Sequence, residues 1–159
     1  MDAMDQAAGL AQDDAIYKAR RTRPEFVEGA ELCRLSVLTP RHGLGFAVEM
    51  RIAVAQRIAA LNADTVLTEE YERQLAALAA AQPLLDLARG ASELPEPLKT
   101  IARHVDFITQ TPTDAKKADI TRLEAAGLSN PQIVALSELI AFVNFQARVA
   151  AGLRLMRLA

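Results

Sequence analysis

The sequence is short of the residues that thiol and metal chemistry need. Its 159 residues include one cysteine, Cys33, and two histidines, His42 and His104. One cysteine excludes an internal disulfide and a thiolate metal cluster. No carboxylate stands at the spacing of a helical metal motif such as Glu-x-x-His, so we predict no metal site and no cofactor.

Aromatic residues and surplus charge are also scarce. Aromatics make up 4% of the chain, tryptophan is absent, and the formal net charge is −2. A chain without a basic surplus lacks the electrostatic footprint of nucleic-acid-binding proteins and the polybasic patch of membrane-surface proteins. The longest apolar stretch, Ile133 to Val143, is interrupted by Ser137 and Glu138 and falls short of the ~20 residues of a membrane span. With an acidic start unlike a signal peptide, we expect a cytoplasmic protein without nucleic-acid or membrane partners.

Alanine and leucine dominate a hydrophobic fraction of 51%. Both residues favour closely packed helices over strands, so the composition predicts an all-α bundle. Residues 1–12 show no clear apolar face and are expected to be flexible, which leaves 13–159 as a single helical domain. Apolar stripes and breakers predict helices over about 13–21, 24–38, 46–61, 68–78, 83–87, 98–108, 115–126 and 133–156.

Two segments near the C-terminus carry a family resemblance. Leu123 to Ser129 reads Leu-x-x-x-Gly-Leu-Ser, and Ala141 to Leu153 reads Ala-x-x-Asn-Phe-x-x-Arg-x-Ala-x-Gly-Leu. Together they resemble the C-terminal module of peroxidase-related proteins in the AhpD-like/carboxymuconolactone decarboxylase superfamily. The match spans residues 98–153, with a weaker match over 46–78. The resemblance implies an AhpD-like helical bundle that assembles as a homodimer or larger homo-oligomer, and symmetry makes a dimer the default.

The resemblance also implies where a redox site would lie. Redox-active members carry Cys-x-x-Cys at the start of a helix, with a histidine and a glutamate nearby. That grouping lowers the pKa of one thiol so that its thiolate attacks peroxide. Alignment on Asn62 puts Asp64 and Leu67 at the cysteine positions, Tyr71 at the histidine and Ile52 at the glutamate. No register supplies a cysteine, so thiol peroxidase activity is not expected.

Three residues are candidates for catalysis. Tyr71 and Asp64 stand where the family keeps its redox site, where a phenol and a carboxylate can bind a polar ligand or move a proton. Equally, Asp64 can cap a helix and Tyr71 can pack at an interface. His104 adjoins the apolar stripe of the 98–108 helix, where a structural histidine is more usual than a general base.

Three further residues are candidates for ligand binding. Ser137, Asn144 and Arg148 share one face of the last predicted helix. They form either the polar floor of a pocket or an internal network that fixes the helix in the bundle. The internal network is the more common role of polar groups on so apolar a helix.

The function remains open among three hypotheses. We favour a redox-inactive superfamily member that binds or transforms a small organic molecule by non-thiol chemistry. The alternative is a non-catalytic structural or partner-binding helical protein. The third is an antioxidant peroxidase that uses Cys33. Because Cys33 falls on a predicted apolar stripe with Phe26, Ala30 and Val37, we expect it to be a buried structural cysteine.

Overall fold

The computed structural model describes residues 1–158, which form helices and loops and, within that range, no strand. The all-α prediction is confirmed. In chain order the elements are α1 (Ala3–Ala8), α2 (Ala15–Arg20), α3 (Pro24–Leu38), α4 (Val48–Leu61), α5 (Thr65–Ala77), α6 (Gln82–Ala88), α7 (Leu98–Gln110), the 3-10 turn η1 (Pro112–Asp114), α8 (Lys117–Ala125) and α9 (Asn130–Leu158).

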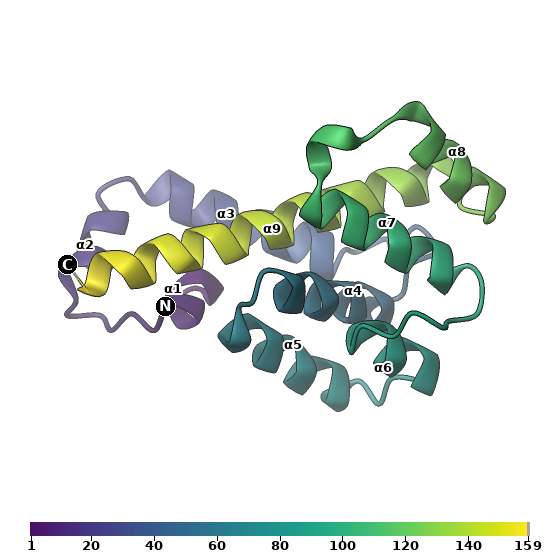
Figure 1. Ribbon diagram of the computed structural model, residues 1–159. Coiled ribbons are helices and arrows are strands. Elements are labelled where there is room, and N and C mark those ends of the chain that lie inside the picture. The colour runs from purple at the N-terminus through teal and green to yellow at the C-terminus, as the bar shows by residue number, and fades with distance from the viewer. Residues whose placement is uncertain (159) are drawn as a thin grey trace.

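The long helix α9 runs through the molecule and contacts elements at both of its ends (Figure 1). Helices α1, α2 and α3 lie along its C-terminal half, whereas α7 and α8 lie beside its N-terminal half. The first residues of the chain and the end of α9 are therefore at the same end of the fold (Figure 1). By length and composition α9 would also suit a membrane span, but 61% of its most apolar window is buried here, as in a core helix.

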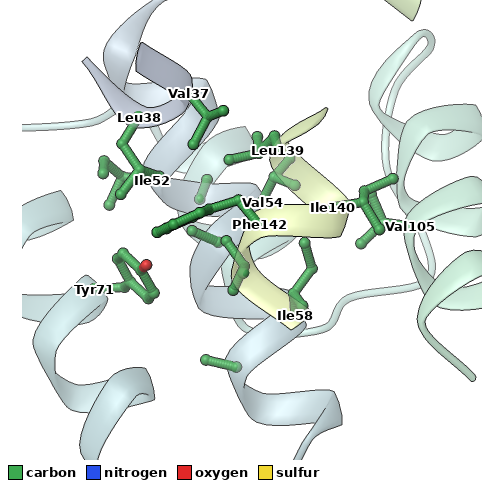
Figure 2. Packing of buried hydrophobic residues seen from close by; sticks show 14 of the residues in the cluster. Val37, Leu38, Ile52, Val54, Ile58, Tyr71, Val105, Leu139, Ile140 and Phe142 are labelled. Atoms are coloured by element: carbon green, nitrogen blue, oxygen red, sulfur yellow. The ribbon is translucent and has the colours of Figure 1, made fainter. Parts of the chain in front are cut away.

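Helix α4 is the centre of the core. Every residue from Met50 to Ala59 is buried, because α3, α5, α6, α7 and α9 all pack around this helix. Figure 2 shows side chains of α4, such as Ile52, meeting Tyr71 of α5 and Phe142 of α9. The arrangement places the α5 and α9 side chains that form the candidate site against a fully packed layer.

Two arginines on α4 are buried among these helices and are fully engaged. The Arg51 guanidinium donates to the backbone oxygens of Val37 and Gly43, both at 2.8 Å. The Arg57 guanidinium donates to both carboxylate oxygens of Asp106 on α7, at 2.6 and 2.7 Å. Since a buried charge is tolerated only when paired and hydrogen-bonded, these contacts fix α4 against the 37–46 segment and α7.

The N-terminal segment differs from its predicted flexibility. Residues 3–8 form α1, where the Asp2 and Asp5 side chains cap each other's backbone N–H groups at 2.7 and 3.1 Å. Met4 and Leu10 belong to the core, and the fully buried Asp5 carboxylate pairs with Arg20 of α2 and with Arg21, the residue after that helix. Sequence analysis missed this helix because its capping box uses aspartate where glutamate or glutamine is usual, and because its apolar face is short.

Helix α3 also differs from the prediction, since Cys33 is exposed rather than buried. Of the predicted stripe only Val37 joins the core, and the Phe26 side chain is 61% exposed. Leu32, which lies off the predicted stripe, is 67% exposed. The reason is that α3 packs on α4 and α9 mainly through its last turn, at Val37 and Leu38.

Candidate functional site

Two clefts flank α9, and five of the six candidate residues line one or the other. Tyr71 lines a cleft among α1, α3, α5 and α9, together with Gln146 of α9. His104, Ser137, Asn144 and Arg148 line a second cleft among α7, α8 and α9. Residues two apart on a helix point about 200° from each other, so Gln146 and Asn144 face different clefts. We call these the Tyr71 cleft and the His104 cleft.

The Tyr71 cleft has a volume of about 420 Å³ and is more polar than apolar in its lining. That volume lies within the range of small-molecule sites, roughly 300–1,000 Å³. Helix α1 forms one wall, so the cleft exists only because the N-terminal residues are folded. The lining residues are Met1, Asp2, Ala3, Gln6, Ala7, Glu31, Arg34, Leu38, Val66, Leu67, Glu70, Tyr71, Arg73, Gln74 and Gln146.

Tyr71 and Gln146 form the most deeply buried polar pair of this cleft. The Tyr71 hydroxyl donates to the side-chain oxygen of Gln146 at 2.5 Å, and the two residues are 2% and 3% exposed. Tyr71 is held there by the buried stripe of Leu67, Tyr71 and Leu75 on α5. Burial raises the pKa of the Tyr71 hydroxyl above its usual range, so it stays protonated and acts as a donor.

One donor of this pair has no protein partner. Within residues 1–158 no group accepts a hydrogen bond from the Gln146 amide nitrogen, although Gln146 lines the cleft. Among residues 1–158 the one fully buried polar side-chain atom without a hydrogen-bond partner is Gln56 Oε1, so the Gln146 amide nitrogen reaches the solvent of the cleft. The Tyr71–Gln146 pair therefore presents a fixed donor to the cleft.

The charged side chains of the Tyr71 cleft are balanced. Arg34 donates through Nε and Nη2 to Glu31, at 2.9 and 2.6 Å, which leaves Nη1 without a partner among the described residues. The Arg34 hydrogen bond holds the pKa of the Glu31 carboxyl below its usual range. On α5, Arg73 pairs with Glu70 at 2.5 Å. Two such pairs leave no strong excess of either sign at the cleft.

Asp64, in contrast, lines neither cleft. Its carboxylate accepts from the backbone N–H of Leu67 at 3.1 Å, which makes it the N-cap of α5, so the helix begins earlier than the predicted residue 68. It also accepts from the Arg154 guanidinium at 2.8 and 3.0 Å, tying the start of α5 to the end of α9. These contacts use both carboxylate oxygens, so the structure places Asp64 in helix capping and helix docking.

The His104 cleft has a volume of about 530 Å³ and a mainly apolar lining. Asn144 at its base is fully engaged: its side chain bonds with Asn62 at 3.0 Å, Thr109 at 3.3 Å and the backbone oxygen of Ile140 at 2.9 Å. Ser137 donates to the backbone oxygen of Ile133 at 2.8 Å. Asn144 thus belongs to an internal hydrogen-bond network, which was one of the two roles predicted for the polar face of the last helix.

Unlike the side chain of Asn144, those of Arg148 and His104 have no hydrogen-bond or ion-pair partner among residues 1–158. The Arg148 side chain is exposed and pairs with no carboxylate among residues 1–158. His104 is 8% exposed, and the nearby Asp119 and Arg122 act on it through charge without a hydrogen bond. Burial lowers the pKa of His104 below its usual range, so the imidazole is neutral at neutral pH.

Neither cleft contains a thiol or a metal-binding cluster. Cys33, the only cysteine of the sequence, is exposed on α3 and lines neither cleft. Within residues 1–158 no group of three His, Cys, Asp or Glu side chains is placed to hold a metal ion. The chemistry available to a bound molecule is therefore that of hydroxyl, amide, carboxylate, ammonium, guanidinium and imidazole groups.

Gln146 and Arg34 were not predicted as site residues. Gln146 sits inside the quoted motif of the last helix, two residues beyond Asn144, but a glutamine on an apolar helix gives no catalytic signal by itself. Arg34 lies on α3, whose orientation the apolar stripe did not predict. A cleft built from four helices far apart in sequence leaves no local pattern.

Comparison with known proteins shows the fold but no family. No family model matches the sequence, and no curated protein matches it. Among solved structures the chain resembles the crystal structure of an uncharacterized peroxidase-related protein from Silicibacter sp. TM1040. The TM-score is 0.72 at 16% identity, with 86% of this chain and 72% of that chain covered. The predicted AhpD-like helical fold is consistent with this neighbour, whereas identity this low carries no function.

Proposed function

We propose that this chain is an AhpD-like protein without thiol peroxidase chemistry that binds a small organic molecule in the Tyr71 cleft. The observation that carries the proposal is the buried Tyr71–Gln146 pair, whose amide nitrogen is left to face the cleft. On the family resemblance, Leu67 and Tyr71 stand at a redox cysteine and its histidine. Both line the cleft, which supports a ligand at this position, whereas Asp64, at the other cysteine position, does not line it.

The lining indicates the chemical class of the ligand. The Gln146 amide and the free Nη1 of Arg34 are donors, and both suit the oxygen of a carbonyl group. The Arg34–Glu31 and Arg73–Glu70 pairs balance the charge, so a net charge on the ligand gains little. Leu38, Val66 and Leu67 supply an apolar wall. These features favour a small uncharged molecule with a carbonyl oxygen and an apolar body.

The same lining limits the reaction chemistry. With its raised pKa, the Tyr71 hydroxyl can donate a hydrogen bond or a proton but cannot serve as a phenolate base at neutral pH. No thiol lines the cleft, and its carboxylates are all paired with arginines, so we assign any transformation to Tyr71, Gln146 and Arg34. Polarisation of a carbonyl group is the step that these donors support.

Binding of three related probes tests the proposal. Benzamide carries an uncharged carbonyl, benzoate carries a carboxylate on the same ring, and toluene carries neither. We expect saturation-transfer NMR to show benzamide bound most tightly and toluene least. Gln146→Met keeps the side-chain length but removes the donor and should weaken benzamide, whereas Gln82→Met on the exposed surface of α6 should leave it unchanged.

A second variant protects the test against loss of folding. Arg34 is partly exposed, with 21% of its side chain accessible, so Arg34→Ala leaves the core intact. It should also weaken benzamide binding. Equal binding of all three probes, or no effect of either variant, would contradict a carbonyl site.

One observation favours the partner-binding alternative. Helix α3 exposes two large hydrophobic side chains on one face, Leu32 and Leu35, which are three residues apart and point within about 60° of each other. A surface helix usually shows polar residues on its solvent face, so this face suits contact with another protein chain. A chain that binds none of the three probes but forms a complex through α3 would belong to this second class.

A further inference from the structure

We propose that the His104 cleft is a second binding site, separate from the Tyr71 cleft, for a small amphipathic carboxylate. The inference rests on the combination of an apolar floor, unpaired cations at the mouth and an unpartnered buried imidazole in one cleft. It does not depend on the proposed function, because α9 separates the two clefts.

The floor and walls of the cleft are apolar. Ile140, which is 1% exposed, forms part of the base, and Ile108 and Ala141 line its sides. Ile120 of α8 is 37% exposed. An alkyl chain or small ring lying here would cover apolar surface that now faces solvent, which is the main driving force for such binding.

The mouth of the cleft gathers three cations. Lys116 and Lys117 at the start of α8 and Arg148 on α9 line the cleft, and none pairs with a carboxylate within residues 1–158. The whole chain has a formal net charge of −2, so this group does not reflect a generally basic surface. Cations beside an apolar wall favour a ligand with an anionic head and an apolar body.

The acidic residue of the cleft does not cancel these cations. The Asp119 carboxylate accepts from the backbone N–H of Lys116 at 2.7 Å and pairs with Arg122. Its charge is therefore committed to the start of α8. An incoming carboxylate meets Lys116, Lys117 and Arg148 with no free acid among the lining residues.

His104 supplies the independent sign of a ligand. Its residue surface is 8% exposed, and it lines the cleft. It makes no hydrogen bond with Asp119 or Arg122, the charged groups that act on it. A neutral imidazole needs an acceptor for one ring nitrogen and a donor for the other. A carboxylate oxygen in the cleft would accept from the imidazole N–H.

The two histidines of the chain allow a direct test. NMR signals of His104 report the cleft, and those of His42, exposed in the loop before α4, serve as the internal control. Octanoate should shift the His104 signals at sub-millimolar concentration and leave His42 unchanged. Octanol, with the same chain and no charge, should bind about tenfold more weakly because it gains no charge-assisted contact.

Matched variants locate the site. Arg148→Ala should weaken octanoate about fivefold, the scale of one partly exposed ion pair, whereas Arg41→Ala, an exposed arginine that lines neither cleft, should not. Ala141→Phe places a ring over the apolar wall from an exposed helical position and should abolish the His104 shift. Circular dichroism checks that each variant keeps the helical fold.

Three outcomes would overturn the proposal. An unchanged His104 signal at millimolar octanoate would remove the site. Equal effects of Arg148→Ala and Arg41→Ala would show that octanoate binds through general charge attraction. Binding of phosphatidylglycerol vesicles through Arg148, without a response to octanoate, would assign the cations to a lipid surface instead.

Discussion

The Tyr71 hydroxyl donates to the Gln146 side-chain oxygen at 2.5 Å, which joins α5 to α9 at the base of the Tyr71 cleft. The bond fixes the orientation of the Gln146 carboxamide, because its oxygen is held by Tyr71 and its nitrogen is thereby turned to the cleft. A donor held in this way needs no rearrangement when a ligand arrives. Loss of the hydroxyl should therefore affect both stability and binding.

Tyr71→Phe removes the donor and leaves the buried Gln146 oxygen unpaired. We expect the free energy of unfolding to fall by about 1–2 kcal/mol. Benzamide affinity should fall as well, since the carboxamide is free to turn. Urea unfolding and benzamide titration measure the two effects, with Tyr17→Phe, a partly buried tyrosine outside both clefts, as the matched control. A Tyr71→Phe protein that matches wild type in both would contradict the role given to the hydroxyl.

The Arg57–Asp106 pair should be a larger source of stability. Arg57 is 6% exposed and also donates to the backbone oxygens of Leu87 and Ala91, so Arg57→Met removes these hydrogen bonds and leaves the Asp106 carboxylate without its partner. We expect a loss of about 3 kcal/mol in the free energy of unfolding. Arg103→Met, at an exposed position on α7, is the control and should change stability little. Similar losses of unfolding free energy in both variants would show that the Arg57–Asp106 pair does not contribute more to stability than an exposed arginine.

The Asp5 carboxylate should make stability depend on pH. Burial opposes its ionisation, but hydrogen bonds and charge from Arg21 and Arg20 hold the pKa of Asp5 below its usual range. A carboxyl with a lowered folded-state pKa stabilises the fold above its unfolded pKa of about 3.9, and this contribution is lost as pH falls through the folded value. Asp5→Asn should thus lose about 2 kcal/mol at neutral pH. The difference from wild type should shrink in acid.

Unfolding of both proteins across a pH series checks this prediction. Asp13→Asn, at an exposed aspartate, is the matched control and should follow the wild-type curve. A gap between wild type and Asp5→Asn that stays constant from neutral pH into acid would show that the Asp5 charge does not stabilise α1.

Cys33 offers a test of the corrected position of α3. Because its side chain is exposed, the native protein should react with Ellman's reagent at one thiol per chain without denaturant. Cys33→Ala should leave benzamide binding unchanged, since Cys33 does not line the Tyr71 cleft. A thiol that reacts only after unfolding would contradict the exposed position, and peroxide turnover lost in Cys33→Ala would revive the peroxidase hypothesis.

Self-association is a further proposal, carried by the family resemblance and by the exposed side chains of α3. We propose a homodimer through the α3 face that presents Leu32 and Leu35, since two copies related by a two-fold axis would cover it on both chains. Sedimentation at micromolar concentration should give about twice the mass of the 17.2 kDa chain. Leu32→Glu should return the monomer, whereas Val134→Glu at an exposed site on α9 should not. A wild-type monomer would contradict the proposal.

Much of the fold could be predicted from the sequence because its signals are local. Pro24 at the start of α3 and the 98–108 stripe of α7 gave helices close to their observed bounds. The start of α5 was misplaced, because Asp64 and Thr68 are both acceptable caps and only the position of Leu67 in the core chooses between them. Helix α1 was missed since its stability depends on Arg20 and Arg21, whose pairing with Asp5 is a tertiary contact.

The candidate site could be predicted only in part. Tyr71 was named through the family resemblance, and it does line a cleft. Its partner Gln146 is 75 residues away in sequence, so the pair becomes visible only when α5 and α9 are packed together. Ser137, Asn144 and Arg148 were placed on one face by helical spacing, but spacing alone does not separate the satisfied Asn144 from the unpaired Arg148.

A crystal structure of the protein soaked with benzamide tests the central claim most directly. We predict density for the ring against Leu38 and Leu67, with the carbonyl oxygen within hydrogen-bond distance of the Gln146 amide nitrogen and the Tyr71–Gln146 bond retained. A Tyr71 cleft that holds only water at saturating benzamide, or benzamide bound elsewhere on the surface, would contradict the account.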